Sequence, residues 1–160
     1  MFFIKQNQNE RANEEQGKND GGKATEDQKK VTMFKRLNKD MAELDIPENI
    51  QMTYEKDAKG KDDLQHFRLK LVATEDSYWH KGVYHFKVDV PDDFPISPPK
   101  AHCDTQIYHP NIDMDGNVCL NILRKDWTCV LSINHLIFGL ETLFLNPNPN
   151  DPLNKRNFFL

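Results

Sequence analysis

The sequence predicts an α+β fold in which one helix is followed by a four-stranded antiparallel meander and then by a second helix. Two observations support this. Apolar residues recur every third or fourth position in two segments, the period of an amphipathic helix, and every second position in the segments between them, the period of a half-buried strand. The 160 residues of the chain suffice for one domain, with or without a tail.

The first helix is expected over residues 26–44. Phe34, Leu37, Met41 and Leu44 follow one another at spacings of three and four, with polar residues between them, so they form one apolar stripe. Pro47 marks the end of the segment, because proline cannot continue a helix.

Four strands are expected next, at residues 50–56, 64–73, 83–90 and 100–104. The second strand carries Phe67, Leu69 and Leu71 at period two, and the third has the same alternation. Gly60 marks the turn between the first two strands, and a proline cluster at residues 95–99 precedes the last one.

Residues 106–130 show no regular period, although Pro110 and Gly116 indicate turns. The segment is long for a structureless loop, and its Ile, Val, Leu and Trp content argues against disorder, so a functional role is expected. The second helix follows, with Ser132 as its N-cap. Its expected apolar face consists of Ile133, Leu136, Ile137, Leu140, Leu143 and Phe144.

Residues 1–25 are expected to form a flexible tail, because they hold almost no bulky apolar side chain beyond the first four positions. Those four positions form an apolar tip of Met1, Phe2, Phe3 and Ile4. From composition alone, the tip is as consistent with an idle terminus as with a docking segment.

Charge and cysteine usage restrict the function classes. The formal net charge of −4 disfavours nucleic-acid binding, which needs a basic face. No segment approaches the ~20 apolar residues that span a bilayer, so no membrane partner is expected. Three cysteines and no secretion signal favour the reducing cytoplasm or nucleus.

Three kinds of site compete for the polar residues of the irregular segment. Asp113 and Asp115 have the opening spacing of an EF-hand calcium loop, but the twelfth position is Ile122 where a glutamate is required. The cysteines and histidines around Cys119 lack the paired spacings of structural zinc sites. A papain-like protease needs a histidine base that only the fold can bring close. We therefore expect no metal and no cofactor.

Residues 108–131 resemble the active-site region of the ubiquitin-conjugating enzyme family, the UBC family. The resemblance rests on the triplet His109-Pro110-Asn111, Cys119 eight residues after that asparagine, and Trp127 eight residues further on. It implies that Cys119 is the nucleophile that carries a modifier as a thioester.

The similarity extends from about residue 26 to residue 155 and includes the proline-rich segments 94–99 and 147–154. It implies that residues 26–160 form a UBC catalytic core with the family's helix, four-stranded meander, extended active-site segment and crossover helix. Family members continue for about two further helices of typical length, so a C-terminally truncated core is expected.

Within the family, residues 119–124 and the tail with its apolar tip resemble the branch that conjugates Nedd/Rub-type modifiers. The resemblance implies a heterodimeric activating enzyme, a RING-type ligase, a cullin co-ligase and a cullin substrate as partners. It also implies that Met1 to Ile4 dock on the activating enzyme and the co-ligase. Two alternatives stay open: a ubiquitin carrier, and an inactive binding module with the same fold.

The resemblance also assigns roles to single residues. Asn111 is expected to stabilise the oxyanion of the tetrahedral state, although a purely structural role of its amide in the loop stays open. Asp151 is expected to position the attacking lysine amine. The ligase-facing loops are expected to include Ile96, Ser97, Thr128, Cys129 and Val130, and the cysteine departs from the proline that the family usually has there.

Overall fold

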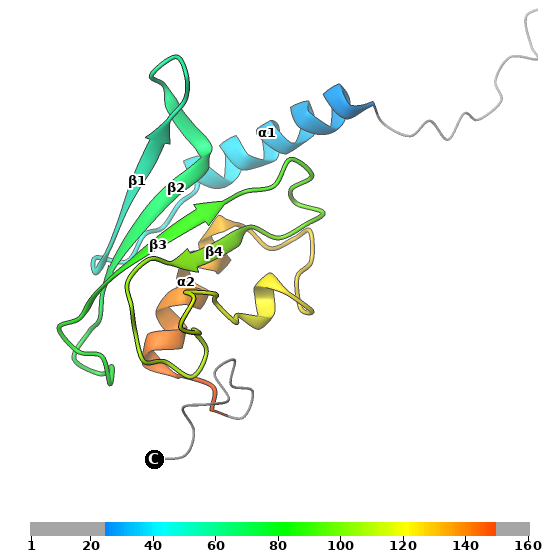
Figure 1. Ribbon diagram of the computed structural model, residues 1–160. Helices are drawn as coiled ribbons and strands as arrows, with labels where there is room; N and C mark the ends of the chain where they lie inside the picture. Colours follow the sequence, from blue (N-terminus) through cyan, green and yellow to red (C-terminus); the bar gives the residue numbers. More distant parts are fainter. Residues whose placement is uncertain (1–24, 150–160) are drawn as a thin grey trace, which may run out of the picture.

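The computed structural model describes residues 25–149 (Figure 1). The elements in chain order are α1 (Glu26–Ala42), β1 (Ile50–Lys56), β2 (Asp62–Val72), β3 (Val83–Asp89), β4 (Lys100–Cys103), the 3₁₀ turn η1 (Asn121–Leu123) and α2 (Ile133–Leu145). The strands form one antiparallel sheet in the order β1-β2-β3-β4. The predicted α+β meander is therefore confirmed, and each predicted helix or strand boundary lies within two residues of the observed one.

The core lies between one face of the sheet and α2. Alternate residues of β2 and β3 are buried, among them Phe67, Leu69 and Phe86, because successive side chains of a strand point to opposite faces. From α2 come all six of the residues predicted for its apolar face. Those six positions follow the helical period, so this face was readable from the sequence.

The predicted stripe of α1 was wrong at one position. Phe34 is 38% exposed, whereas Met33 and Leu37 are completely buried and Asp40 joins them on the buried face. Residues 33, 37 and 40 have helical spacing, just as the predicted set had. Asp40 on this face has a contact in another part of the chain, at Ile133.

Asp40 and Arg36 connect α1 to the start of α2. Oδ2 of Asp40 accepts from the backbone N–H of Ile133 at 3.2 Å, which satisfies a donor of the first helical turn. Oδ1 of Asp40 accepts from Nε of Arg36 at 2.8 Å, and the same guanidinium donates to the carbonyls of Cys129 and Leu131 at 2.6 Å each. One ion pair thus holds the loop before α2.

The end of α1 is also decided by a tertiary contact. The helix ends at Ala42, two residues before the predicted end. Nδ2 of Asn134 donates to the carbonyl of Glu43 at 2.8 Å, and Oδ1 of Asn134 accepts from the N–H of Asp45 at 2.9 Å. These bonds from α2 satisfy backbone groups that another helical turn would otherwise use.

Replacing Asp40 by alanine is expected to lower the free energy of unfolding by about 1–3 kcal/mol, because the N–H of Ile133 and the Arg36 guanidinium both lose a partner. Chemical denaturation measures this loss. Lys35→Ala, at an exposed position of α1, is the control and should change stability little. Equal stability of the two variants would mean that the Asp40 network does not hold the two helices together.

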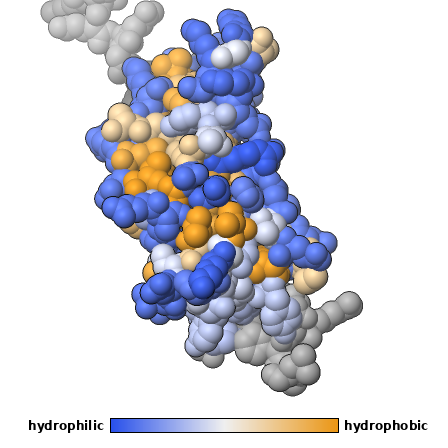
Figure 2. All heavy atoms as spheres, turned by 90° about the vertical axis from the view of Figure 1, so that its left-hand side faces the viewer, coloured by the Kyte–Doolittle hydropathy of each residue, from blue (hydrophilic) through white to orange (hydrophobic). Residues whose placement is uncertain are grey.

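Figure 2 shows the face on the β1 side, where apolar groups gather in the middle and hydrophilic groups surround them. No helix within residues 25–149 has the length and apolarity needed to cross a membrane. The predicted tail, apart from its last residue, lies outside the described residues. Thr25 is described, and it caps α1 by accepting from the N–H of Gln28 at 3.4 Å. The expected C-terminal truncation concerns the chain after residue 149, which likewise lies outside the described residues.

Candidate active site

The irregular segment between β4 and α2 is ordered by turns and isolated bridges rather than by strands. The bridges join His102 to Asn117, His109 to Ile112, and Ile112 to Val118. Gly116 has φ +81°, and a side chain there would collide with the carbonyl of Cys103. Glycine is therefore required at this position, and the loop can fold back against β4.

Asp113, which belongs to the calcium-like spacing in the sequence, stabilises this turn by hydrogen bonds. Oδ1 of Asp113 accepts from the backbone N–H groups of Asp115 and Asn117 at 3.0 and 2.8 Å, and Oδ2 accepts from Nδ2 of Asn117 at 2.8 Å. Partial desolvation opposes ionisation, but these hydrogen bonds hold the pKa of Asp113 below its usual value. No cluster of three metal-binding side chains occurs among residues 25–149.

His109 is a buried structural residue with a defined tautomer. It is 1% exposed and stacks on Trp79 with ring centroids 4.2 Å apart. Nδ1 accepts from the N–H of Asn111 at 2.9 Å, so the ring proton is on Nε2, which donates to the carbonyl of Leu143 at 2.9 Å. Because both nitrogens are engaged, His109 has no free lone pair with which to act as a base.

Burial lowers the pKa of His109 from 6.5 to about 4. The unfolded chain therefore binds more protons than the folded one between these pH values, and stability rises with pH in that window. The contribution of His109 is complete above its unfolded pKa and disappears as the pH falls towards 4. The shift corresponds to about 3 kcal/mol.

His109→Gln removes this titration. The difference in unfolding free energy between the original chain and this variant is expected to shrink by about 3 kcal/mol from neutral pH to about pH 4. Denaturant melts over a pH series measure it. His85→Gln makes the same substitution at an exposed position of β3 and is the matched control. A constant difference for His109→Gln would show that His109 is not buried in its neutral form.

Asn111 and Cys119, two of the predicted catalytic residues, lie next to each other. The carbonyl of Asn111 accepts from the N–H of Cys119 at 2.8 Å. The Asn111 side chain is 2% exposed; its Nδ2 donates to the carbonyl of Asn148 at 2.9 Å, and its Oδ1 accepts from the N–H of Asn148 at 2.8 Å. The amide therefore holds the segment after α2 against the Cys119 loop.

The three cysteines have three different environments. Cys103 belongs to the core and its Sγ donates to the carbonyl of Thr105 at 3.2 Å; burial raises its pKa, which keeps it protonated and inert. Cys129 is exposed. Cys119 is 7% exposed but does not belong to the contiguous core.

The turn η1 brings a cation to this thiol. Nη1 of Arg124 donates to Sγ of Cys119 at 3.1 Å. The turn packs on α2 at Gly139, where a side chain would collide with Leu120 and Ile122. Sequence reasoning missed this contact, because it found no period in residues 106–130; the five-residue spacing between the cysteine and the arginine was the only available signal.

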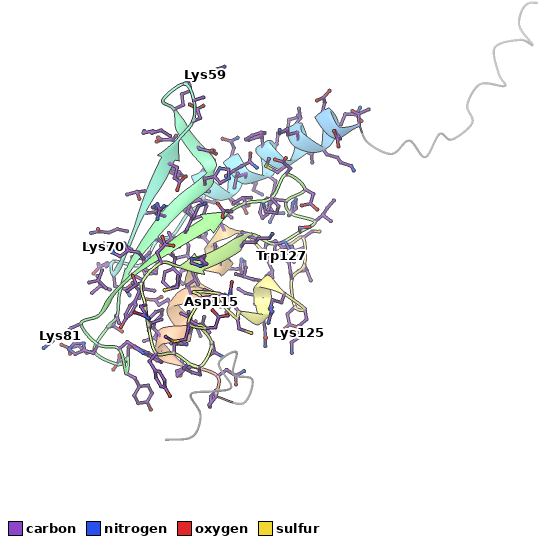
Figure 3. All side chains as sticks on the ribbon, in the orientation of Figure 1. Lys59, Lys70, Lys81, Asp115, Lys125 and Trp127 are labelled. Carbon is purple, nitrogen blue, oxygen red and sulfur yellow. The ribbon has the colours of Figure 1, made fainter. Side chains whose placement is uncertain are left out.

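The five predicted ligase-facing residues lie on two loops that are joined. Nε1 of Trp127 donates to the carbonyl of Pro95 at 2.8 Å, and this tryptophan is labelled beside the loops in Figure 3. Ile96 is 69% and Val130 is 81% exposed. Ser97 bonds within its own loop to Asp93. Thr128 and Cys129 are also exposed, so the five residues are available on the surface.

The remaining predicted site residues are not described by the structure. Asp151 and the tip residues Met1, Phe2, Phe3 and Ile4 lie outside residues 25–149. Their roles stay predictions from the sequence. Asn148, which contacts Asn111, is near the end of the described part.

Comparison with known proteins adds independent information. The profile of the family described as "Ubiquitin-conjugating enzyme" matches residues 36–158. The chain is 45% identical over 141 residues to the Nedd8-conjugating enzyme UbcE2M of Drosophila melanogaster, covering 88% of this chain and 75% of that protein. It is 47% identical over 120 residues to the NEDD8-conjugating enzyme Ubc12 of Dictyostelium discoideum, with 75% of this chain and 50% of that protein covered. The chain thus spans about half the length of the Dictyostelium protein.

A solved structure gives the same result in three dimensions. The S. cerevisiae Ubc12 structure superposes with a TM-score of 0.70 at 42% identity, over 77% of this chain and 67% of that chain. The resemblance inferred from the His-Pro-Asn triplet, the cysteine and the tryptophan is confirmed, together with the fold it implied. The chain belongs to the ubiquitin-conjugating enzyme family.

Proposed function

We propose that this chain is a transferase that conjugates a NEDD8-type modifier. Cys119 accepts the modifier from an activating enzyme as a thioester and passes it to a substrate lysine. The observation that carries this proposal is the identity of 42–47% to proteins named NEDD8-conjugating enzymes in Dictyostelium, Drosophila and Arabidopsis. The contact between the Cys119 loop and Asn111 supports it.

The chemistry needs one thiol, one oxyanion donor and one group that orients an amine. The sulfur of Cys119 attacks the modifier's carbonyl, and the amine later replaces the sulfur. The tetrahedral state of that second step carries negative charge on oxygen, which the Asn111 amide would stabilise by rearranging its bond to Asn148. Asp151 would orient the lysine amine. No metal or cofactor takes part in these steps.

A thioester assay tests the proposal. Purified chain is incubated with ATP, a NEDD8-activating enzyme and NEDD8, and in parallel with a ubiquitin-activating enzyme and ubiquitin. The expected result is a conjugate with NEDD8 only, which collapses when reducing agent is added. A conjugate with ubiquitin alone would transfer the assignment to that modifier, and no conjugate with either would indicate a binding module without activity.

The proposed protein partners bind two parts of the chain, the joined loops and the N-terminal tip. We propose that the joined loops with Ile96 and Val130 contact a RING-type ligase, because exposed apolar side chains on a rigid support suit a protein interface. A cullin is the proposed substrate, with a cullin co-ligase that binds the N-terminal tip. The cytoplasm or the nucleus is the proposed location.

Deleting Met1 to Ile4 is expected to weaken recruitment of the activating enzyme by about tenfold or more. Each apolar side chain of the tip contributes roughly 1.5–3 kcal/mol when a partner buries it fully, and 1.4 kcal/mol is about a factor of ten. The charging rate as a function of enzyme concentration measures this effect. Stability should be unchanged, and identical charging curves would show that the tip is an idle terminus.

The acetyl group at the N-terminus gives a second readout for the tip. An acetylated chain is expected to bind the cullin co-ligase more tightly than a chain with a free amine, because burying a charged amine is costly. Titration of the co-ligase with both forms measures the difference. Equal affinities would mean that the amine stays in water when the tip is bound.

A further inference from the structure

We infer that Arg124 is a further catalytic residue, which stabilises negative charge on the sulfur of Cys119 through direct contact. Nη1 of Arg124 lies 3.1 Å from Sγ, so the guanidinium touches the reacting atom. Arginine stays protonated at every working pH. A hydrogen bond between a cation and a thiolate is stronger than one to a neutral thiol, so the contact strengthens when negative charge develops on the sulfur during transfer.

Backbone hydrogen bonds fix the position of Arg124 in the turn that follows η1. The N–H of Arg124 donates to the carbonyl of Asn121 at 3.0 Å, and the carbonyl of Arg124 accepts from the N–H of Trp127 at 3.4 Å. Trp127 is in turn bonded to Pro95. Both backbone polar groups of Arg124 are thus held by the turn that η1 closes, and this turn returns the side chain to the cysteine five residues earlier.

Among residues 25–149, no carboxylate neutralises the charge of the Arg124 guanidinium. Arg124 is exposed, so packing against neighbouring side chains does not explain why its guanidinium lies against Cys119. Because Arg124 has no carboxylate partner within the described part of the chain and contacts the sulfur directly, its charge is available to stabilise negative charge that develops on the sulfur.

The inference deepens the proposed function and rests on it for the two transfer steps. In charging, the Cys119 thiolate forms a C–S bond to the modifier's carbonyl carbon, and the thiolate of the activating enzyme leaves. In discharge, the lysine nitrogen bonds to that carbon, the C–S bond breaks with its electron pair on sulfur, and the ammonium proton passes to solvent. Arg124 stabilises the sulfur anion before the first step and after the second, so it assists both.

The test uses a reagent that needs neither modifier nor activating enzyme. Iodoacetamide alkylates thiolates, and the rate at Cys119 near neutral pH is followed by mass spectrometry. In Arg124→Gln this rate is expected to fall about fivefold to tenfold, since a charge-assisted hydrogen bond at a partly exposed site is lost. Arg124→Lys should restore most of the rate, because it returns the positive charge.

Two controls separate this effect from general changes in charge or folding. Lys125→Gln removes the same charge one residue away and should alter the rate by less than about twofold, because exposed charges at a distance are screened; Lys125 is labelled near η1 in Figure 3. Cys129 is exposed in the same molecule, and its alkylation rate should be equal in all variants. Melting temperatures should also be equal, because Arg124 is exposed.

Several results would overturn the inference. An unchanged rate in Arg124→Gln would mean that the contact has no chemical effect, and a faster rate would mean that Arg124 only shields the sulfur. A loss of equal size in Lys125→Gln would assign the effect to net charge. If alkylation behaves as expected but neither the original chain nor any variant forms a conjugate with NEDD8, the effect of Arg124 on the Cys119 sulfur stands, whereas its part in the two transfer steps falls together with the proposed function.

Discussion

Replacing Cys119 by serine is expected to abolish the thioester and to leave only a slow, reductant-resistant ester. The two side chains have similar volumes, so the fold should persist. An ordinary thiol is a few per cent ionised at neutral pH, whereas an alcohol is essentially not ionised, and we expect modification to be at least about 10²-fold slower. A gel of the charging reaction with and without reducing agent distinguishes the two bonds.

Cys103 and Cys129 provide the matched controls for this experiment. Cys129→Ser changes an exposed side chain and should leave thioester formation intact. Cys103→Ser places a hydroxyl in the core, which costs some stability because a polar group is buried. The carbonyl of Thr105 can accept from this hydroxyl and limits the loss. The thioester should remain. If either variant lost the thioester while Cys119→Ser retained turnover, the nucleophile would have been assigned to the wrong cysteine.

Replacing Asn111 by alanine is expected to slow transfer to lysine by about 10²–10³-fold, the usual cost of losing one oxyanion donor. Charging of Cys119 should stay largely intact. The physical reason is that the attack of the lysine amine depends on stabilising negative charge on the carbonyl oxygen. Charging, in which the modifier passes from one thiol to another, depends less on this stabilisation. Single-turnover discharge of a preformed thioester to free lysine separates this step from charging.

The structure adds a competing role that this experiment must separate. Both polar atoms of the Asn111 side chain are bonded to the backbone of Asn148, so the alanine variant also loses an anchor of that segment. Asn117→Ala removes another amide of the same loop, whose side chain bonds to Asp113, and should slow neither step. Equal slowing of charging and discharge in Asn111→Ala, with a lower melting temperature, would favour the structural role.

The sequence alone determined the elements and their order. The alternation in β2 and β3 and the helical spacing in α2 are local periods, and burial of one face follows directly from them. It also predicts Cys119 as the nucleophile, because its spacing from the His-Pro-Asn triplet and from Trp127 resembles that of the ubiquitin-conjugating enzyme family. These signals are short in sequence, so they need no knowledge of what lies across the fold.

The tertiary structure alone decided what joins segments that are far apart in the chain. Asp40 lies on the buried face of α1 with Met33, whereas Phe34 is 38% exposed, and Asp40 accepts from the N–H of Ile133, 93 residues later. Asn111 is fixed by Asn148, 37 residues away. The turn η1, after which Arg124 contacts Cys119, packs closely on α2 at Gly139. In each case the deciding interaction is a hydrogen bond or a close approach between non-local groups, and such contacts have no period by which a sequence can reveal them.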